Sequence, residues 1–179
     1  MNEQQVPTRV TLAVGNEFPE WELDGVAGTT SEIQKLKSTQ YNGWKVYYFY
    51  PKDFTYICPT EIVAMDDLRD EATVFGISGD NEHCKVAWKN SDKKVGSIKH
   101  TLIADVGLNL AHSIGVVDSN NEVCMRATFI VDPQNIIQHL SVNALDTGRS
   151  AVELKRTLLA LKSGGLTGCE WNPGDEHLG

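Results

Sequence analysis

One short segment carries the first residues whose types and spacing suggest chemistry. Pro51, Thr55 and Cys58 follow one another in the order Pro-x-x-x-Thr-x-x-Cys, and Glu61 stands three residues after the cysteine. A thiol in the first turn of a helix faces unpaired backbone N–H groups and the positive end of the helix dipole, and both favour the thiolate. The segment therefore predicts that Cys58 is a nucleophile, because the thiolate is the reactive form.

The elements around this segment must place the cysteine at a helix start. Residues 44–50 are apolar and rich in aromatic and β-branched types, which predicts a strand buried on both faces. A helix is expected over residues 59–71, because Pro59 suits a first turn and apolar residues follow at helical spacing. Residues 73–78 predict a second buried strand, which closes a β-α-β unit with parallel neighbouring strands. This pattern indicates an α/β fold.

The rest of the chain continues the alternation of helices and strands. Cys84, Ala87, Trp88 and Ser91 share one face of an expected helix, which we interpret as a core stripe. The last helix is expected to begin at Ser150, with Glu153 completing a capping box. The expected elements are a helix over 81–91, a strand over 102–104, a short helix over 108–112, a hairpin of strands 126–131 and 136–142, and a helix over 150–162.

The cysteines and the C-terminal segment complete the organisation. We expect a single domain over residues 1–179, in which residues 164–179 form a tail without periodicity that contains Cys169. The four cysteines form no Cys-x-x-Cys pair and no cluster with histidine, which argues against a structural zinc site. Cys84 and Cys124 are interpreted as structural.

Composition narrows the classes of partner. The formal net charge is −8, from 24 acidic against 16 basic residues, which argues against nucleic acid and anionic membrane as partners. No apolar run approaches the roughly 18 residues of a membrane span. Residues 1–19 lack the apolar core of a secretory signal, so the expected location is the cytoplasm.

The segment from Phe49 to Glu61 resembles the active-site motif of the peroxiredoxins, thiol peroxidases that reduce hydroperoxides. Its continuation Cys58-Pro-Thr-Glu61 is similar to the subfamily that contains the peroxidatic component of alkyl hydroperoxide reductase. The resemblance covers residues 15–174. It implies a thioredoxin-like fold, with a central mixed sheet flanked by helices, an N-terminal extension and a C-terminal tail.

The resemblance also implies roles for residues of the motif. Cys58 would be the peroxidatic cysteine, Thr55 would hydrogen-bond both the peroxide and the thiolate, and Pro51 would shield the thiolate from water. The segment 125–132 resembles the family strand whose arginine, here Arg126, lies beside the nucleophile. Taken without the motif, Cys58 would be an inert core cysteine, Thr55 a plain N-cap, Pro51 a strand terminator and Arg126 an exposed charge.

Three further residues enter by the same resemblance. Thr147-Gly-Arg149-Ser150 matches the family segment ahead of the last helix, and Glu61 would orient Arg126 and Arg149 through ion pairs. Cys169 would be the resolving cysteine that condenses with the oxidised Cys58. Glu170 stands where a proline is often found in related sequences. The sequence leaves open whether the disulfide would join two subunits or lie within one chain.

The implied activity is a peroxidase for hydrogen peroxide and alkyl hydroperoxides that needs no metal, haem or flavin. The implied partners are a second copy of the chain, in homodimers or rings of five dimers, and a dithiol reductant. A flavoprotein disulfide reductase, thioredoxin and a helical dithiol hydroperoxidase all fit as the reductant. Thiol–disulfide exchange on proteins is a second activity, disfavoured by the lack of Cys-x-x-Cys. A peroxide sensor or holdase is the non-enzymatic alternative.

Overall fold

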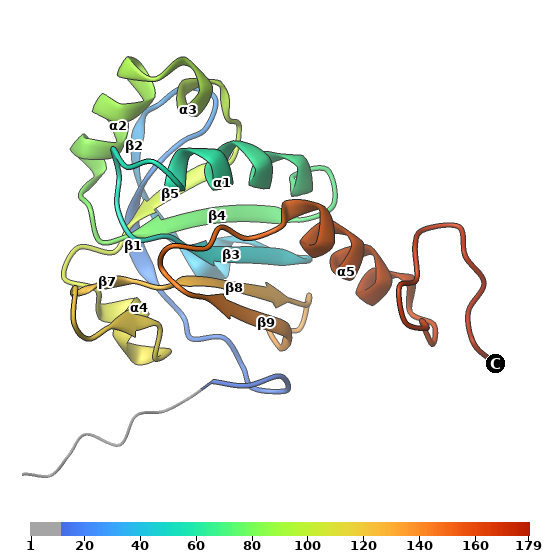
Figure 1. The fold of residues 1–179 in the computed structure, drawn as a ribbon. Coiled ribbons are helices and arrows are strands. Elements are labelled where there is room, and N and C mark those ends of the chain that lie inside the picture. The colour runs from blue at the N-terminus through green and yellow to red at the C-terminus, as the bar shows by residue number, and fades with distance from the viewer. Residues whose placement is uncertain (1–11) are drawn as a thin grey trace, which may run out of the picture.

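A seven-stranded mixed sheet forms the centre of the molecule in the computed structural model, which describes residues 12–179 (Figure 1). The strand order is β2-β1-β5-β4-β3-β8-β9, and β6 and β7 form a separate two-stranded ribbon. The strands are β1 (Glu22–Val26), β2 (Ile33–Lys37), β3 (Lys45–Phe49), β4 (Thr73–Ser78), β5 (Thr101–Ala104), β6 (Val117–Asp118), β7 (Val123–Cys124), β8 (Arg126–Val131) and β9 (Ile137–Asn143).

The helices follow the expected alternation and cover both faces of the sheet. They are α1 (Cys58–Met65), α2 (Glu82–Ser91), α3 (Lys93–Ser97), α4 (Asn109–Ser113) and α5 (Ala151–Ser163), with 3-10 turns η1 (Ser38–Gln40) and η2 (Asp66–Leu68). Side chains of α1, α2, α3 and α5 share one buried cluster, whereas those of α4 belong to the cluster on the opposite face. The thioredoxin-like architecture expected from the resemblance is confirmed.

The middle of the sheet is formed by the strands β4, β3 and β8. β3 pairs in parallel with β4, as the β-α-β prediction required, and antiparallel with β8. Every residue of β3 is buried, so its apolar run packs on both faces of the sheet. Tyr48 points into the cluster beneath α1 and α5, while Tyr47 and Phe49 point into the other cluster. The buried strand β3, paired on both edges, therefore fixes the point at which the loop before Cys58 begins.

Several sequence expectations need correction. The helix expected over 59–71 is two elements, because α1 ends at Met65 and η2 continues to Leu68. The core stripe assigned to α2 is wrong: Ala87 is exposed and Cys84 is half-buried, while Lys85, Trp88 and Lys89 are buried. The prediction failed because it placed only apolar residues on the buried face of the helix, whereas that face includes Lys85 and Lys89.

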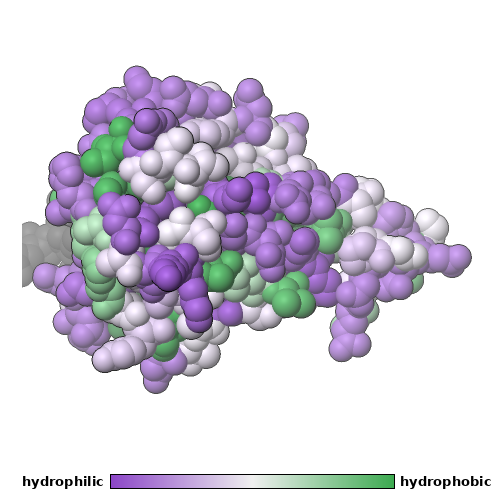
Figure 2. All heavy atoms as spheres, turned by 90° about the horizontal axis from the view of Figure 1, so that it is seen from above, coloured by the Kyte–Doolittle hydropathy of each residue, from purple (hydrophilic) through white to green (hydrophobic). Residues whose placement is uncertain are grey.

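The C-terminal region forms α5 followed by a projecting loop. The Ser150 hydroxyl accepts from the backbone N–H of Glu153, but the Glu153 carboxylate binds Arg156, so only half of the expected capping box is present. Beyond Gly164, which adopts φ 73°, no helix or strand follows. The loop nevertheless has a buried anchor, because Trp171 is only 7% exposed. Figure 2 shows this segment standing away from a body whose visible face is mainly hydrophilic.

Candidate active site

Cys58 is the first residue of α1, as the motif predicted. Its side chain is fully buried, and its Sγ accepts a hydrogen bond from Nη1 of Arg126 over 3.4 Å. The backbone enters the helix without a side-chain cap, since Ile57 occupies the N-cap position. The thiol therefore receives one oriented cationic donor in addition to the dipole of its own helix.

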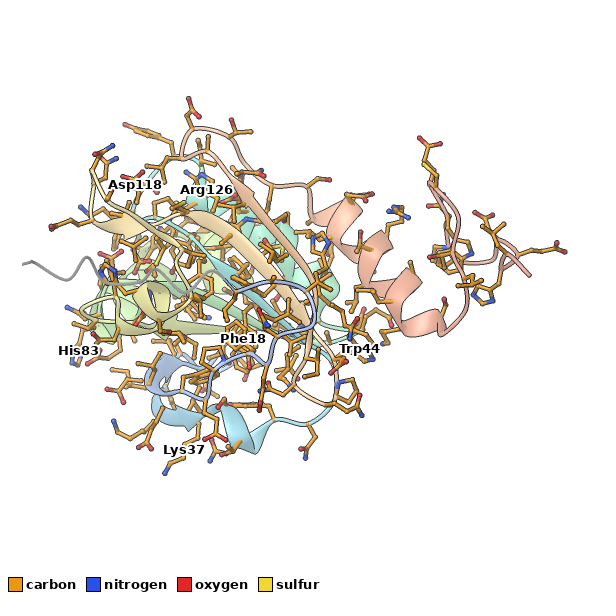
Figure 3. All side chains as sticks on the ribbon, turned by 90° about the horizontal axis from the view of Figure 1, so that it is seen from below. Phe18, Lys37, Trp44, His83, Asp118 and Arg126 are labelled. Atoms are coloured by element: carbon orange, nitrogen blue, oxygen red, sulfur yellow. The ribbon has the colours of Figure 1, made fainter. Side chains whose placement is uncertain are left out.

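Arg126 extends from the start of β8, on a strand that is buried throughout (Figure 3). Only 5% of its surface is exposed, which excludes the alternative of an exposed edge charge. Its Nη1 also donates to Oε2 of Glu61 over 2.6 Å, and its Nε donates to the carbonyl of Leu145 over 2.6 Å. These bonds fix the guanidinium plane, which a lysine ammonium would not reproduce.

Glu61 joins the two arginines. Its Oε1 accepts from Nε of Arg149 over 2.9 Å and from the backbone N–H of Arg149 over 3.1 Å. Arg149 also donates to Thr128 and to the carbonyls of Ala127 and Phe49. The structure thus brings Cys58, Glu61, Arg126 and Arg149 into one buried hydrogen-bonded chain. Removing Glu61 or either arginine would leave an uncompensated buried charge.

Thr55 and Pro51 lie in the loop before the helix, and the structure does not join them to the thiol. The Thr55 hydroxyl donates to the carbonyl of Lys52 over 2.8 Å. The alternative that Thr55 is a plain N-cap is wrong, because Ile57 occupies the N-cap position of α1. Pro51 is half-buried and borders a groove of about 690 Å³ between the loop and the β6–β7 ribbon. Cys58 does not line that groove.

The other three cysteines differ in burial, and Cys84, which was expected in the core, is only half-buried. Cys124 is fully buried, and burial raises the pKa of its thiol to about 12. Burial, followed by the charges of Asp53 and Asp80, also raises the pKa of Cys84. Cys169 is exposed in the C-terminal loop. All four cysteines are free thiols, and the structure does not bring Cys58 and Cys169 together.

A buried triad behind the site was missed by sequence reasoning. Tyr48 shares a hydrogen bond of 2.6 Å with Nε2 of His100, whose Nδ1 lies 2.7 Å from a carboxylate oxygen of Asp66. The Tyr48 ring also lies beneath the guanidinium of Arg149, 5.2 Å from its centroid. Gly76 on β4 makes this arrangement possible, because a Cβ there would collide with the Tyr48 hydroxyl.

A second missed group lies under the loop before Cys58. Lys85 of α2 and Asp53 of the loop form an ion pair of 3.3 Å between side chains that are both fully buried. Tyr50 and Ser78 complete the group by hydrogen bonds. Nothing in the local pattern distinguishes these charged residues from surface ones. The available signal is that Lys85 precedes the buried Trp88 by one helical turn.

Among residues 12–179, no group of three or more His, Cys, Asp or Glu side chains could hold a metal ion. No helix in that range is both long and apolar enough to cross a membrane.

Comparison with known proteins identifies the class. Residues 14–140 match the model of the AhpC/TSA family. This chain belongs to the AhpC/TSA family. An alkyl hydroperoxide reductase C of Mycolicibacterium smegmatis is 36% identical over 93% of both chains, and a putative peroxiredoxin of Bacillus subtilis is 35% identical over 92% of this chain and 97% of its own. The reduced 2-Cys peroxiredoxin of Plasmodium vivax superposes with a TM-score of 0.85 at 31% identity, covering 96% of this chain and 93% of that one. As a member of the AhpC/TSA family, the protein is a peroxiredoxin-type thiol peroxidase.

Proposed function

We propose that the protein reduces hydrogen peroxide and alkyl hydroperoxides through a sulfenic acid at Cys58 and a disulfide between Cys58 and Cys169. The observation that carries the proposal is the 3.4 Å contact between Cys58 Sγ and Arg126 Nη1, inside a buried chain that Glu61 holds together. Nη1 of Arg126 faces the nucleophile, and the hydrogen bonds of Arg126 to Glu61 and Leu145 fix the orientation of the guanidinium. Such preorganised donors stabilise charge that develops during a reaction.

The first step is displacement at the peroxide bond. The Cys58 thiolate attacks the terminal oxygen of ROOH, the S–O bond forms as the O–O bond breaks, and RO⁻ leaves and takes a proton to give ROH. Sulfur loses two electrons and the peroxide gains them. Arg126 would stabilise both the thiolate and the departing oxyanion. Thr55 and Pro51 would complete the pocket, with the Thr55 hydroxyl turning from the Lys52 carbonyl to the peroxide.

The second step condenses the sulfenic acid with Cys169. The Cys169 thiol displaces water from Cys58–SOH to give the disulfide. Cα atoms of a disulfide lie within about 7 Å of each other, so a buried Cys58 and an exposed Cys169 must approach. We propose that the two cysteines come from different subunits of a homodimer, because the C-terminal loop projects away from the body of its own subunit (Figure 1). An external dithiol then reduces the disulfide and is itself oxidised.

The test is peroxide consumption combined with mapping of the oxidised cysteines. Wild-type protein with a dithiol reductant should consume hydrogen peroxide over many turnovers. The oxidised protein should run as a disulfide-linked dimer on a non-reducing gel and yield a Cys58–Cys169 peptide. Cys84→Ser is the matched control, since it removes a thiol outside the buried chain and should keep both properties. A peptide map dominated by disulfides of Cys84 or Cys124 would contradict the proposal.

A further inference from the structure

The loop that joins β3 to α1 is fixed at one buried point. Of residues 51–57, only Asp53 is buried. Phe54 is 55% exposed with φ 56° and makes one ring contact, with Trp88 of α2 at 5.7 Å between centroids, while Tyr56 is 97% exposed. Few packed contacts therefore oppose movement of this loop away from Asp53, and segments of this kind open locally at low free-energy cost.

Asp53 is held by groups that lie in, or directly after, the strands β3 and β4 and the helix α2. Its carboxylate accepts from the hydroxyl of Tyr50 over 2.7 Å and from Nζ of Lys85 over 3.3 and 3.4 Å. Its backbone N–H donates to Asp80 over 2.7 Å. Lys85 is fixed in turn, because its Nζ also donates to Ser78 over 2.6 Å. The loop is thus bound to β4 and α2 by charge-assisted hydrogen bonds that water does not screen.

We propose that Lys85 is a positioning residue for Cys58, and that its ion pair with Asp53 is the latch that keeps the 51–57 loop closed and Cys58 buried. This inference rests on the proposed function, because only a Cys58 that must reach Cys169 needs the loop to open. Opening carries Asp53 into water and separates the pair. The latch therefore sets how long the sulfenic acid stays buried before Cys169 can attack it.

Replacement of Lys85 should shift the equilibrium between the closed and the open loop toward the open form. In Lys85→Met the closed loop holds a buried carboxylate without its cation, whereas in the open loop the same carboxylate is hydrated. Removing one partner of a buried pair is strongly destabilising for the state that buries the other. The open population should rise about a hundredfold. Disulfide formation should then gain over further oxidation of the sulfenic acid by a second peroxide, which gives sulfinic acid.

Lys89→Met provides a matched control on the same helix. Lys89 is also buried and lies one turn later, but its Nζ donates to the carbonyl of Gly28 and not to the loop. Amide hydrogen exchange followed by mass spectrometry on the fully reduced protein measures opening without any peroxidase turnover. We expect exchange over residues 51–57 to accelerate about a hundredfold in Lys85→Met, with little change in Lys89→Met.

The second measurement is the ratio of Cys58–Cys169 disulfide to Cys58 sulfinate after peroxide treatment. This ratio should rise in Lys85→Met and stay at the wild-type value in Lys89→Met. If Lys85→Met does not fold, Asp53→Asn decides, since it removes the ion pair at nearly constant shape and should also accelerate exchange in the loop. Unchanged loop exchange in the folded variants would overturn the latch. Accelerated exchange with no disulfide in any protein would instead overturn the proposed function.

Discussion

Replacement of Arg126 by lysine separates the effect of geometry from that of charge. In the structure two nitrogens of Arg126 serve three acceptors: Sγ of Cys58, a carboxylate oxygen of Glu61 and the carbonyl of Leu145. An ammonium on a flexible stem keeps the charge but cannot hold this set in one plane. We expect Arg126→Lys to lose the donor aimed at the reacting atoms.

The expected size follows from these contacts. Removing one preorganised donor to a developing oxyanion costs about 2.7–4 kcal/mol, or a factor of about 10²–10³ in rate. The cost in folding should be smaller, because Glu61 keeps its two bonds from Arg149. The unpaired Leu145 carbonyl should cost about 1–3 kcal/mol of the free energy of unfolding. The activation free energy should therefore rise by more than the free energy of unfolding falls.

The assay is the second-order rate constant for oxidation by hydrogen peroxide, measured over the first turnover by stopped-flow fluorescence. Urea unfolding of the same samples gives the free energy of unfolding. Arg69→Lys is the control, since Arg69 is a half-exposed arginine that pairs loosely with Asp66 over 3.8 Å. Its rate constant should match that of the wild type. If Arg126→Lys stays within about threefold of the wild type, a point charge suffices and the geometric reasoning fails.

Three further outcomes are expected. Cys58→Ser should fold but consume no peroxide, because an alcohol lacks a reactive anion here; wild-type-like consumption would refute the assignment. Cys169→Ser should complete one oxidation of Cys58 and then stop, without a disulfide-linked dimer on a non-reducing gel. Burial lowers the pKa of His100, and Asp66 opposes this only in part. The folded protein thus binds fewer protons than the unfolded chain below about pH 6.5, so stability present above that pH should be lost on acidification. His100→Gln should flatten that slope in urea titrations; equal slopes would remove His100 as the cause.

The sequence predicted the centre of the fold because its signals there are local. The apolar run of β3, the motif that starts α1 and the strand β4 are each recognisable within a few residues. β1 and β2 were not predicted, because β2 has one buried residue in five and the two strands pair at the edge of the sheet. Strands whose side chains are mostly exposed give no clear alternation.

The site divides in the same way. Cys58, Glu61, Arg126 and Arg149 were expected together, and the structure places them in contact. The pair of Asp53 and Lys85 was not foreseen, because the residues are 32 positions apart and charged residues are rarely fully buried. Pairing is what makes such burial tolerable, and pairing is a property of the folded chain and not of either segment.

The buried chain at the site also has an electrical balance that depends on the redox state of Cys58. With the thiolate present, two anions, Cys58 and Glu61, face two cations, Arg126 and Arg149, and the charges sum to zero. A neutral sulfenic acid leaves one positive charge in excess in a region sealed from water. An isolated charge in such surroundings is costly. The buried charges of the site are therefore balanced while Cys58 is a thiolate. Conversion of the thiolate to the sulfenic acid removes that balance, which favours exposure of the site to water or binding of an anion there.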